Sequence, residues 1–246
     1  MNIEESKKQF KMYVDSYNFD NEKIKLKYYH SLRVSKLCKD IAISLNLNEE
    51  DIKVAELLGL LHDFGRFEQV KIYNTFNDKK SVNHAILGIE ELKKFGFDKF
   101  IEDKKIQKLI EIAILNHNKT FIETNLTERE TLFCKIIRDA DKIDIFYIIQ
   151  DDEYVPTNDF IGDKIFDRII NYQVDFEHNI NILENYVIKV AMIYDINFLW
   201  SYKYLYDKNY ISNIIDKIIS TNKQEEKLLI IKDKIINYLK NKEELC

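Results

Sequence analysis

Four of the five histidines in this chain of 246 residues fall where a helix would turn its apolar side inward. They are His30, His62, His84 and His117. One such histidine alone would be a hydrogen-bonded core residue, because leaving a buried imidazole unpaired costs about 1–3 kcal/mol. Four of them, accompanied by Asp63 and by the pair Asp141 and Asp144, indicate a metal site. Neutral imidazole and ionised carboxylate are ligands that first-row metals use.

The adjacent residues His62 and Asp63 place a condition on the local structure. Consecutive residues of a helix point about 100° apart. The two side chains can therefore bind metal from two sides only close to the end of a helix. Gly65 follows two residues later, and helices commonly end at a glycine. The sequence therefore predicts a helix end at this point.

Five segments in which apolar residues recur with helical periodicity carry the candidate ligands. They cover about residues 25–45, 48–64, 81–95, 102–117 and 127–149. Each of the first four carries one histidine on or at the end of its apolar face. The fifth carries the two later aspartates and opens with a capping box of Thr127 and Glu130. The segment between His62 and His84, which contains residues 67–69 and 73–77, is expected to form an active-site loop.

A domain boundary is predicted at residues 151–159, an acidic and turn-prone stretch that contains the only proline, Pro156. Residues 1–150 would form a helical metal-binding domain, and residues 151–246 a helical extension packed on it. In the extension, helices are predicted over residues 161–172, 181–206, 209–220 and 223–240. No segment alternates apolar and polar residues as a strand does, so the predicted fold class is all-α. The extension could wall the site or form the surface of a homodimer, and the sequence does not separate these two roles.

The composition excludes several classes of protein. Only 5 glycines and 1 proline argue against β-rich folds and folds with a glycine-rich loop. A net charge of −5, with acidic and basic residues intermixed, argues against general nucleic-acid binding. The three cysteines are not spaced as in a C-x-x-C zinc-binding motif, and we expect them to be reduced thiols. No apolar signal segment follows Met1, and charged residues interrupt the apolar stretch 186–206, so we expect a cytoplasmic protein that does not enter a membrane.

The order of the candidate ligands resembles the H…HD…H…H…D signature of the HD-domain metal-dependent phosphohydrolase superfamily. The neighbourhoods that resemble its motifs are residues 60–66, 83–88 and 138–144, and the resemblance covers roughly residues 25–150. It implies an HD-domain helical bundle with additional C-terminal helices. The ligands that it implies for a first metal are His30, His62, Asp63 and Asp141.

The resemblance extends to the subgroup with a two-metal site. There His84 and His117 would bind a second metal, with Asp63 as the bridging carboxylate. The implied cofactors are therefore two divalent metal ions. We expect Fe or Mn, with Mg, Co, Ni and Zn as alternatives, because cellular availability decides among such metals more than ligand type does.

The resemblance also implies that basic residues beside the ligands bind phosphate. Arg66 stands where related phosphodiesterases often have a lysine after H-D-x-G, and a guanidinium can bind two phosphate oxygens. Lys119 follows His117 by two residues and is a second candidate. With Asp63, these two residues form the predicted catalytic set. The alternative for both is a solvated surface charge.

Other charged residues flank the ligands at residues 138–144. Asp144 lies one turn after Asp141. It could orient a metal ligand through a hydrogen bond without contacting the metal itself, or it could pair with a surface lysine. Lys142 is expected to be a solvated surface charge. Arg138 and Asp139 are expected to be flanking charges only.

The leading functional prediction is a metal-dependent phosphohydrolase. As a phosphomonoesterase or phosphodiesterase, it would cleave a small phosphorylated molecule or a nucleotide through a metal-activated water. Two alternatives remain open. Some HD-fold proteins hold a mixed-valence di-iron pair in the same set of six ligands and act as oxygenases, and the metals could instead be structural parts of a ligand-sensing module.

Overall fold

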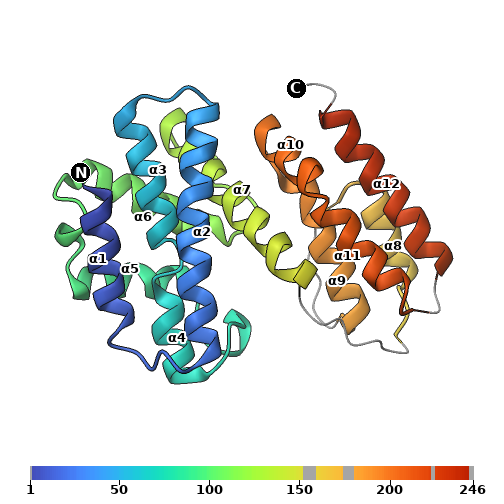
Figure 1. Ribbon diagram of the computed structural model, residues 1–246, viewed down its shortest axis with the longest axis horizontal. Coiled ribbons are helices and arrows are strands. Elements are labelled where there is room, and N and C mark those ends of the chain that lie inside the picture. The colour runs from blue at the N-terminus through green and yellow to red at the C-terminus, as the bar shows by residue number, and fades with distance from the viewer. Residues whose placement is uncertain (1, 152–158, 174–179, 223–224, 244–246) are drawn as a thin grey trace. The chain divides into compact units, whose positions relative to one another are not determined.

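The computed structural model of the protein describes residues 2–151, 159–173, 180–222 and 225–243 (Figure 1). Over these residues all regular elements are helices and none is a strand, which confirms the predicted all-α fold class. Within the same ranges, no helix is both long enough and apolar enough to cross a membrane.

The chain forms two compact units, residues 1–141 and residues 142–246. The division falls within helix α7 (Glu128–Asp151), before the boundary predicted after residue 150. Most of the turn-prone stretch that suggested this boundary, at positions 152–158, lies outside the described residues.

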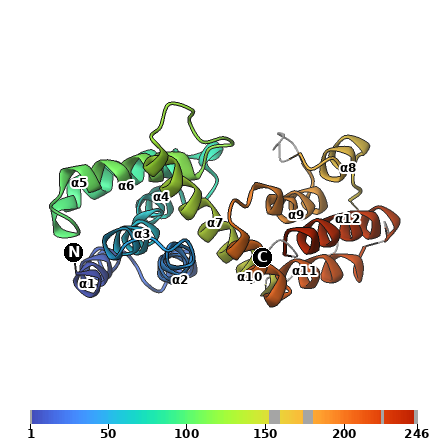
Figure 2. The same cartoon turned by 90° about the horizontal axis from the view of Figure 1, so that it is seen from above.

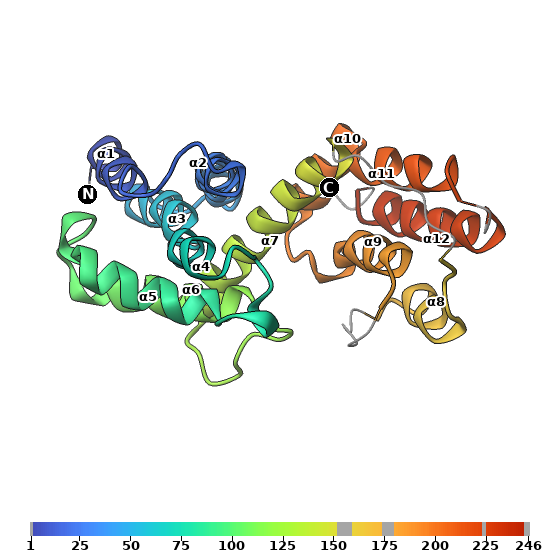
Figure 3. The same ribbon diagram turned by 90° about the horizontal axis from the view of Figure 1, so that it is seen from below.

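The first unit contains the segments that carry the candidate ligands. Its helices are α1 (Ile3–Val14), α2 (Glu22–Ser44), α3 (Glu49–Leu61), α4 (Gly65–Tyr73), α5 (His84–Phe95), α6 (Lys104–His117) and the first part of α7. Short 3-10 turns lie at Asp78–Lys80 and Phe97–Lys99. In Figures 2 and 3, α3 and α4 lie between α2 on one side and α5 and α6 on the other. The middle of this unit is therefore covered by helices on both sides.

Short polar side chains fix where several of these helices begin. The side chains of Asn21, Asn48, Asn83 and Asp103 each accept a hydrogen bond from a backbone N–H in the first turn of α2, α3, α5 and α6. Such caps satisfy N–H groups that have no partner inside the helix. The capping box predicted before α7 is also present, with Thr127 N donating to Glu130 Oε2 at 2.8 Å and Glu130 N donating to Thr127 Oγ1 at 3.2 Å.

The prediction of an active-site loop between His62 and His84 is wrong over Gly65–Tyr73, where the chain forms α4. Phe67 is fully buried and packs edge-on against Phe10, with ring centroids 5.7 Å apart. The helix ends at Asn74, whose φ of 49° lies in the left-handed region. This helix is too short for its few buried apolar residues to give a clear periodic pattern. Helix α1, which precedes α2, was not among the predicted helices either.

Two glycines allow helices of the first unit to approach closely. A Cβ at Gly65 would lie 2.3 Å from the carbonyl oxygen of His84 and 2.5 Å from the nitrogen of Gly88, so α4 and α5 meet there backbone to backbone. A Cβ at Gly59 would lie 2.7 Å from Ser35 Cα on α2. Gly65 thus begins α4 and permits this contact, where the sequence had suggested that it ends the preceding helix.

The second unit contains α8 (Asp163–Ile170), α9 (Ile182–Ala191), α10 (Leu199–Lys208), α11 (Tyr210–Ile219) and α12 (Glu225–Glu243). Helix α12 packs against α8, α10 and α11. The single helix predicted over 181–206 is divided by the 3-10 turn Met192–Asp195 and by Ile196, which has an extended backbone (ψ 141°). The Asn197 side chain donates to Asp195 O at 3.3 Å, a local bond that competes with helix formation.

Candidate metal centre

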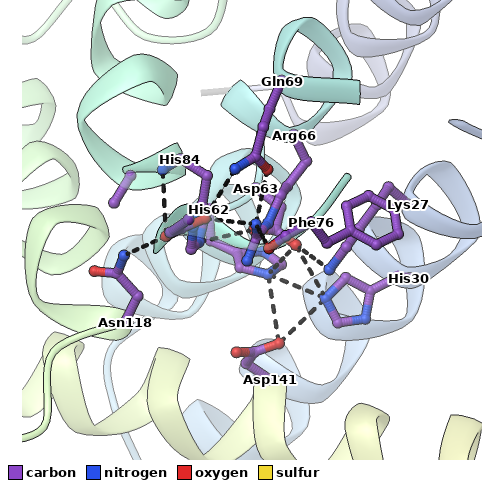
Figure 4. Close-up of polar contacts among 12 residues, drawn as sticks. Lys27, His30, His62, Asp63, Arg66, Gln69, Phe76, His84, Asn118 and Asp141 are labelled. Atoms are coloured by element: carbon purple, nitrogen blue, oxygen red, sulfur yellow. Dashed lines mark hydrogen bonds and ion pairs between the residues drawn. The ribbon is translucent and has the colours of Figure 1, made fainter. Parts of the chain in front are cut away.

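All six candidate ligands come together in the first unit, and Figure 4 labels five of them, all except His117. They are His30, His62, Asp63, His84, His117 and Asp141. Two of them lie within helices α2 and α7, whereas the other four lie where α3 and α6 end and where α5 begins. The helix end predicted at His62 and Asp63 is confirmed, since α3 ends just before them and α4 begins two residues later. Every ligand is buried except Asp141, whose side chain is 19% exposed.

The Oδ2 oxygen of Asp63 faces two of the histidines. It lies 3.4 Å from His30 Nε2 and 3.5 Å from His62 Nε2. Asp141 Oδ1 completes this group at 3.1 Å from His30 Nε2 and 3.7 Å from His62 Nε2. The structure therefore brings together the four residues expected to bind the first metal.

The other oxygen of Asp63, Oδ1, faces the remaining two histidines. It lies 3.4 Å from His84 Nε2 and 3.9 Å from His117 Nε2, and these two nitrogens are 3.0 Å apart. The two oxygens of one carboxylate are thus divided between two groups of imidazoles. This is the arrangement that a bridging carboxylate requires.

The spacing of the ligand atoms fits divalent cations. Two atoms that each bind one metal at about 2.1 Å lie about 3.0 Å apart in octahedral geometry and about 3.4 Å apart in tetrahedral geometry. Most of the spacings in both groups fall near these two values. Four imidazoles and two carboxylates also form a donor set that suits Fe, Mn, Co, Ni or Zn. These residues could therefore hold divalent metal, with Asp63 between the two groups.

Hydrogen bonds orient three of the imidazoles so that Nε2 faces the centre. The Nδ1 of His62 lies 2.8 Å from Gly59 O, and the Nδ1 of His117 lies 2.6 Å from Ile114 O, each a carbonyl three residues upstream. The Nδ1 of His84 lies 2.6 Å from Asp78 Oδ2. Each acceptor keeps a proton on Nδ1, so that Nε2 is the nitrogen through which the ring can bind a metal.

Residues 28–145 match the protein-family model of the HD domain, a span that includes all six ligands. This chain contains an HD domain. HD domains are generally metal-dependent hydrolases that bind divalent metals, and the buried ligand cluster agrees with that chemistry. The match does not extend to the two-metal subgroup, which stays a prediction. No solved structure matches the chain.

The ligands of the HD domain differ in charge. Burial alone would lower the pKa of His62, but Asp63 and Asp141 raise it to about 10. Burial lowers the pKa of His117 to about 3, and neighbouring His84 contributes to this shift. Burial opposes ionisation of Asp63, but Lys27 and His62 hold the pKa of its carboxyl well below the usual range. The cluster therefore combines ionised carboxylates with two kinds of histidine, and its anions favour bound cations.

Arg66 lies beside the ligands, as the resemblance implied. Its Nη1 donates to Asp78 Oδ1 at 2.8 Å, to Gln69 Oε1 at 2.7 Å and to Phe76 O at 2.7 Å. Its Nε is buried, lies 3.5 Å from Asp63 Oδ1 and makes no hydrogen bond within the described part of the chain. The guanidinium is thus anchored at one end and retains a donor that faces the ligand cluster.

Lys27 is a second cation beside the ligands, and its role was not predicted from the sequence. Its Nζ lies 2.5 Å from Asp63 Oδ2, and the side chain is 16% exposed. The ring of Phe76 lies beside both cations (Figure 4), with its centroid 5.4 Å from Lys27 Nζ and 5.7 Å from Arg66 Cζ. A signal was available, because Lys27 lies one helical turn before His30 and therefore on the same face of α2.

The structure does not bring Lys119 to the ligands through any described contact. Its Nζ pairs with Glu123 Oε1 at 2.6 Å, and its side chain is 40% exposed. Asp144 is buried on α7, one turn after Asp141. The catalytic role of Lys119 and the orienting role of Asp144 therefore stay predictions.

Three charged residues that were expected to be flanking or solvated are buried: Arg138, Lys142 and Asp139, which is fully buried. Arg138 is 4% exposed, and its guanidinium donates to the carbonyl oxygens of Asn116 and Thr120, each at 3.2 Å, across the end of α6 that carries His117. Lys142 is 8% exposed and pairs with Asp195 Oδ2 at 2.8 Å. The prediction of flanking or solvated charges is wrong for all three. For Arg138 and Lys142 the reason is that their long side chains reach partners that are distant in sequence.

Proposed function

We propose that the protein is a metal-dependent phosphohydrolase that cleaves an ester bond of a small phosphorylated molecule or nucleotide. The observation that carries the proposal is the division of the two Asp63 oxygens between two pairs of buried histidines, with Lys27 and Arg66 beside them. A purely structural metal site would not need two further cations at its edge.

The residues of the cluster have distinct tasks in such a reaction. Divalent cations held by the six ligands would supply Lewis acidity and activate water. Asp63 contributes an oxygen to each group of ligands. Lys27 and the free Nε–H of Arg66 bind phosphoryl oxygens and offset their negative charge. The Phe76 ring makes a cation–π contact with each of these two cations and so helps to hold them beside the ligands.

Metal analysis and a substrate panel test the proposal. Protein purified without chelator is analysed for metal and is then assayed, after loading with Mn²⁺ or Fe²⁺, against nucleotides, phosphomonoesters and phosphodiesters. We expect hydrolysis that His62→Ala abolishes. Metal-loaded protein that hydrolyses nothing on the panel, with His62→Ala indistinguishable from the parent, would overturn the proposal. Product formation that consumes oxygen would instead assign the oxygenase alternative.

The two cations beside the ligands provide a sharper test. Arg66→Ala and Lys27→Ala should each raise KM by about 10-fold to 100-fold, because each removes a charge-assisted hydrogen bond to phosphate. Lys53→Ala is the matched control, since Lys53 pairs with Glu49 on the exposed side of α3. Unchanged kinetics in both test variants would contradict the phosphate-binding role. Lys119→Ala in the same series decides whether the predicted role of Lys119 holds.

A further inference from the structure

We infer that Asp78 is a positioning residue that fixes one half of the metal centre and joins it to Arg66. Asp78 lies in the short 3-10 turn between α4 and α5, and its side chain is 27% exposed. The sequence gives no periodic relation between this residue and any ligand. The effect of Asp78 on substrate binding rests on the proposed phosphohydrolase function, whereas the effect of Asp78 on metal binding does not.

The position of His84 explains why a partner from outside its helix is needed. His62 and His117 stand at the ends of their helices, so the preceding turn offers each Nδ1 a carbonyl oxygen. His84 is the first residue of α5 and has no preceding helical turn. Asp78 Oδ2 takes the place of that carbonyl, at 2.6 Å from His84 Nδ1. A carboxylate in this position fixes the ring and makes Nε2 a stronger ligand than a neutral acceptor would.

The second oxygen of Asp78 reaches the substrate side of the centre. Asp78 Oδ1 accepts from Arg66 Nη1 at 2.8 Å and from Gln69 Nε2 at 2.9 Å. Arg66 Nε in turn lies 3.5 Å from Asp63 Oδ1, and the same oxygen lies 3.4 Å from His84 Nε2. The contacts among Asp63, His84, Asp78 and Arg66 therefore form a closed ring. A displacement of Asp78 changes a metal ligand and the phosphate-binding cation together.

The test is a titration of chelator-treated, full-length protein with Mn²⁺, followed by calorimetry and by electron paramagnetic resonance. The wild type should bind two equivalents. Asp78→Asn should weaken one equivalent by about 10-fold to 100-fold and leave the other unchanged. The weakened equivalent is identified by comparison with two variants. His84→Ala removes a ligand from the group that Asp78 contacts, and His30→Ala removes a ligand from the other group.

Asp98→Asn is the matched control. Asp98 is also a carboxylate on a 3-10 turn of the first unit, and its Oδ1 accepts from Gln107 Nε2 at 2.6 Å, but none of its described contacts involves a ligand residue. Its variant should titrate like the wild type. The inference is overturned if Asp78→Asn titrates like the wild type, if it weakens both equivalents by the same factor, or if Asp98→Asn has the same effect. Uptake of only one equivalent by the wild type overturns it as well.

A second measurement needs no variant and detects a change that a merely structural role would not cause. In nitrogen-edited spectra of the Zn²⁺-loaded wild type, the His84 proton should reside on Nδ1, shifted downfield by the short bond to the carboxylate. A His84 that carries its proton on Nε2 would overturn the inference. If Asp78→Asn weakens one Mn²⁺ equivalent as expected but the protein hydrolyses no substrate, only the proposed function is overturned. An unchanged Asp78→Asn titration in an active enzyme would overturn the inference alone.

Discussion

The two units of this chain are both helical, but their described interiors differ in chemistry. In the first unit, imidazoles and carboxylates are buried where α3 and α6 end and α5 begins. Over the described residues from α8 to α12 of the second unit, the buried residues are mainly isoleucine, leucine, valine and tyrosine, and the buried polar ones are Ser201 on α10 and Asn222 between α11 and α12. Helices that run past one another bury apolar stripes. Helices that terminate at a common point can instead deliver polar side chains to it, together with the free polar groups of their last turns.

This difference has an energetic consequence. Buried carboxylates are costly unless a cation or a set of donors compensates them. Asp63 has Lys27 and His62 for this purpose, and divalent metal would compensate it more strongly. The first unit should therefore depend on cations, whereas the apolar part of the second unit should not. The following predictions test that contrast.

The largest effect is expected for Asp63→Asn. The change removes the anion that both groups of ligands share and places an amide N–H where a cation would bind. We expect loss of metal from both groups and a fall in kcat of about 10³-fold or more, measured by metal analysis and turnover. Asp98→Asn, which changes an exposed carboxylate of the same unit, should have neither effect. Retention of two metal equivalents by Asp63→Asn would contradict a bridging role.

Truncation of a buried apolar residue should separate stability from metal binding. Ile214 lies in α11 at 2% exposure, and Ile214→Ala should lower the free energy of unfolding by about 2–5 kcal/mol. Metal stoichiometry should stay unchanged, because no ligand lies in α11. Leu58→Ala in α3, one turn before His62, should cost a similar amount and also weaken metal binding. Equal metal affinities in the two variants would remove the contrast between the units.

Metal loading should stabilise the first unit selectively. At a free Mn²⁺ concentration of 100 times Kd, binding at one site stabilises the folded state by about 2.7 kcal/mol. Hydrogen exchange of the most protected amides in α3 and α6 should therefore slow by about 100-fold. Amides of α11 and α12 should exchange at the same rate with and without metal. Equal slowing in all four helices would show that the second unit shares the dependence on cations.

The smallest effect is expected for pH. His62 has its pKa raised to about 10, so at neutral pH it carries a proton that a metal must displace. Because protons compete with metal below this pKa, the apparent affinity for Mn²⁺ should rise by about tenfold from pH 7 to pH 8. Calorimetry in buffers of different ionisation enthalpy should show release of one proton per equivalent bound at this group. An affinity that does not change with pH would contradict a protonated His62.

The sequence predicted which six residues come together, because imidazoles and carboxylates suit a metal and their order along the chain resembles the HD-domain signature. It predicted most helices of the first unit because long apolar faces repeat along them. It could not predict Asp78, which reaches His84 from a loop with no regular spacing. The burial of Arg138 was equally hidden, because it depends on how α7 packs against the end of α6.

Some of the missed features did leave a signal in the sequence. A histidine at the first position of a helix lacks the upstream carbonyl that orients the Nδ1 of other ligands. The Nδ1 of His84 therefore needs an acceptor from the preceding loop. Lys27 and His30 share one face of α2. Both relations combine a residue type with a place in a helix, and neither depends on hydrophobic periodicity alone.

The wide separation of the ligands along the chain gives a bound metal a topological role. His30 and His62 are 32 residues apart, and His84 and His117 are 33 residues apart. A metal shared by either pair cross-links the chain as a disulfide would, and closing a loop of this length removes about 3–4 kcal/mol of unfolded-state entropy at room temperature. The last ligand, Asp141, follows all the others. During synthesis the set of ligands is therefore complete only after α7 has been made as far as Asp141, so metal capture would report that the whole first unit has been made.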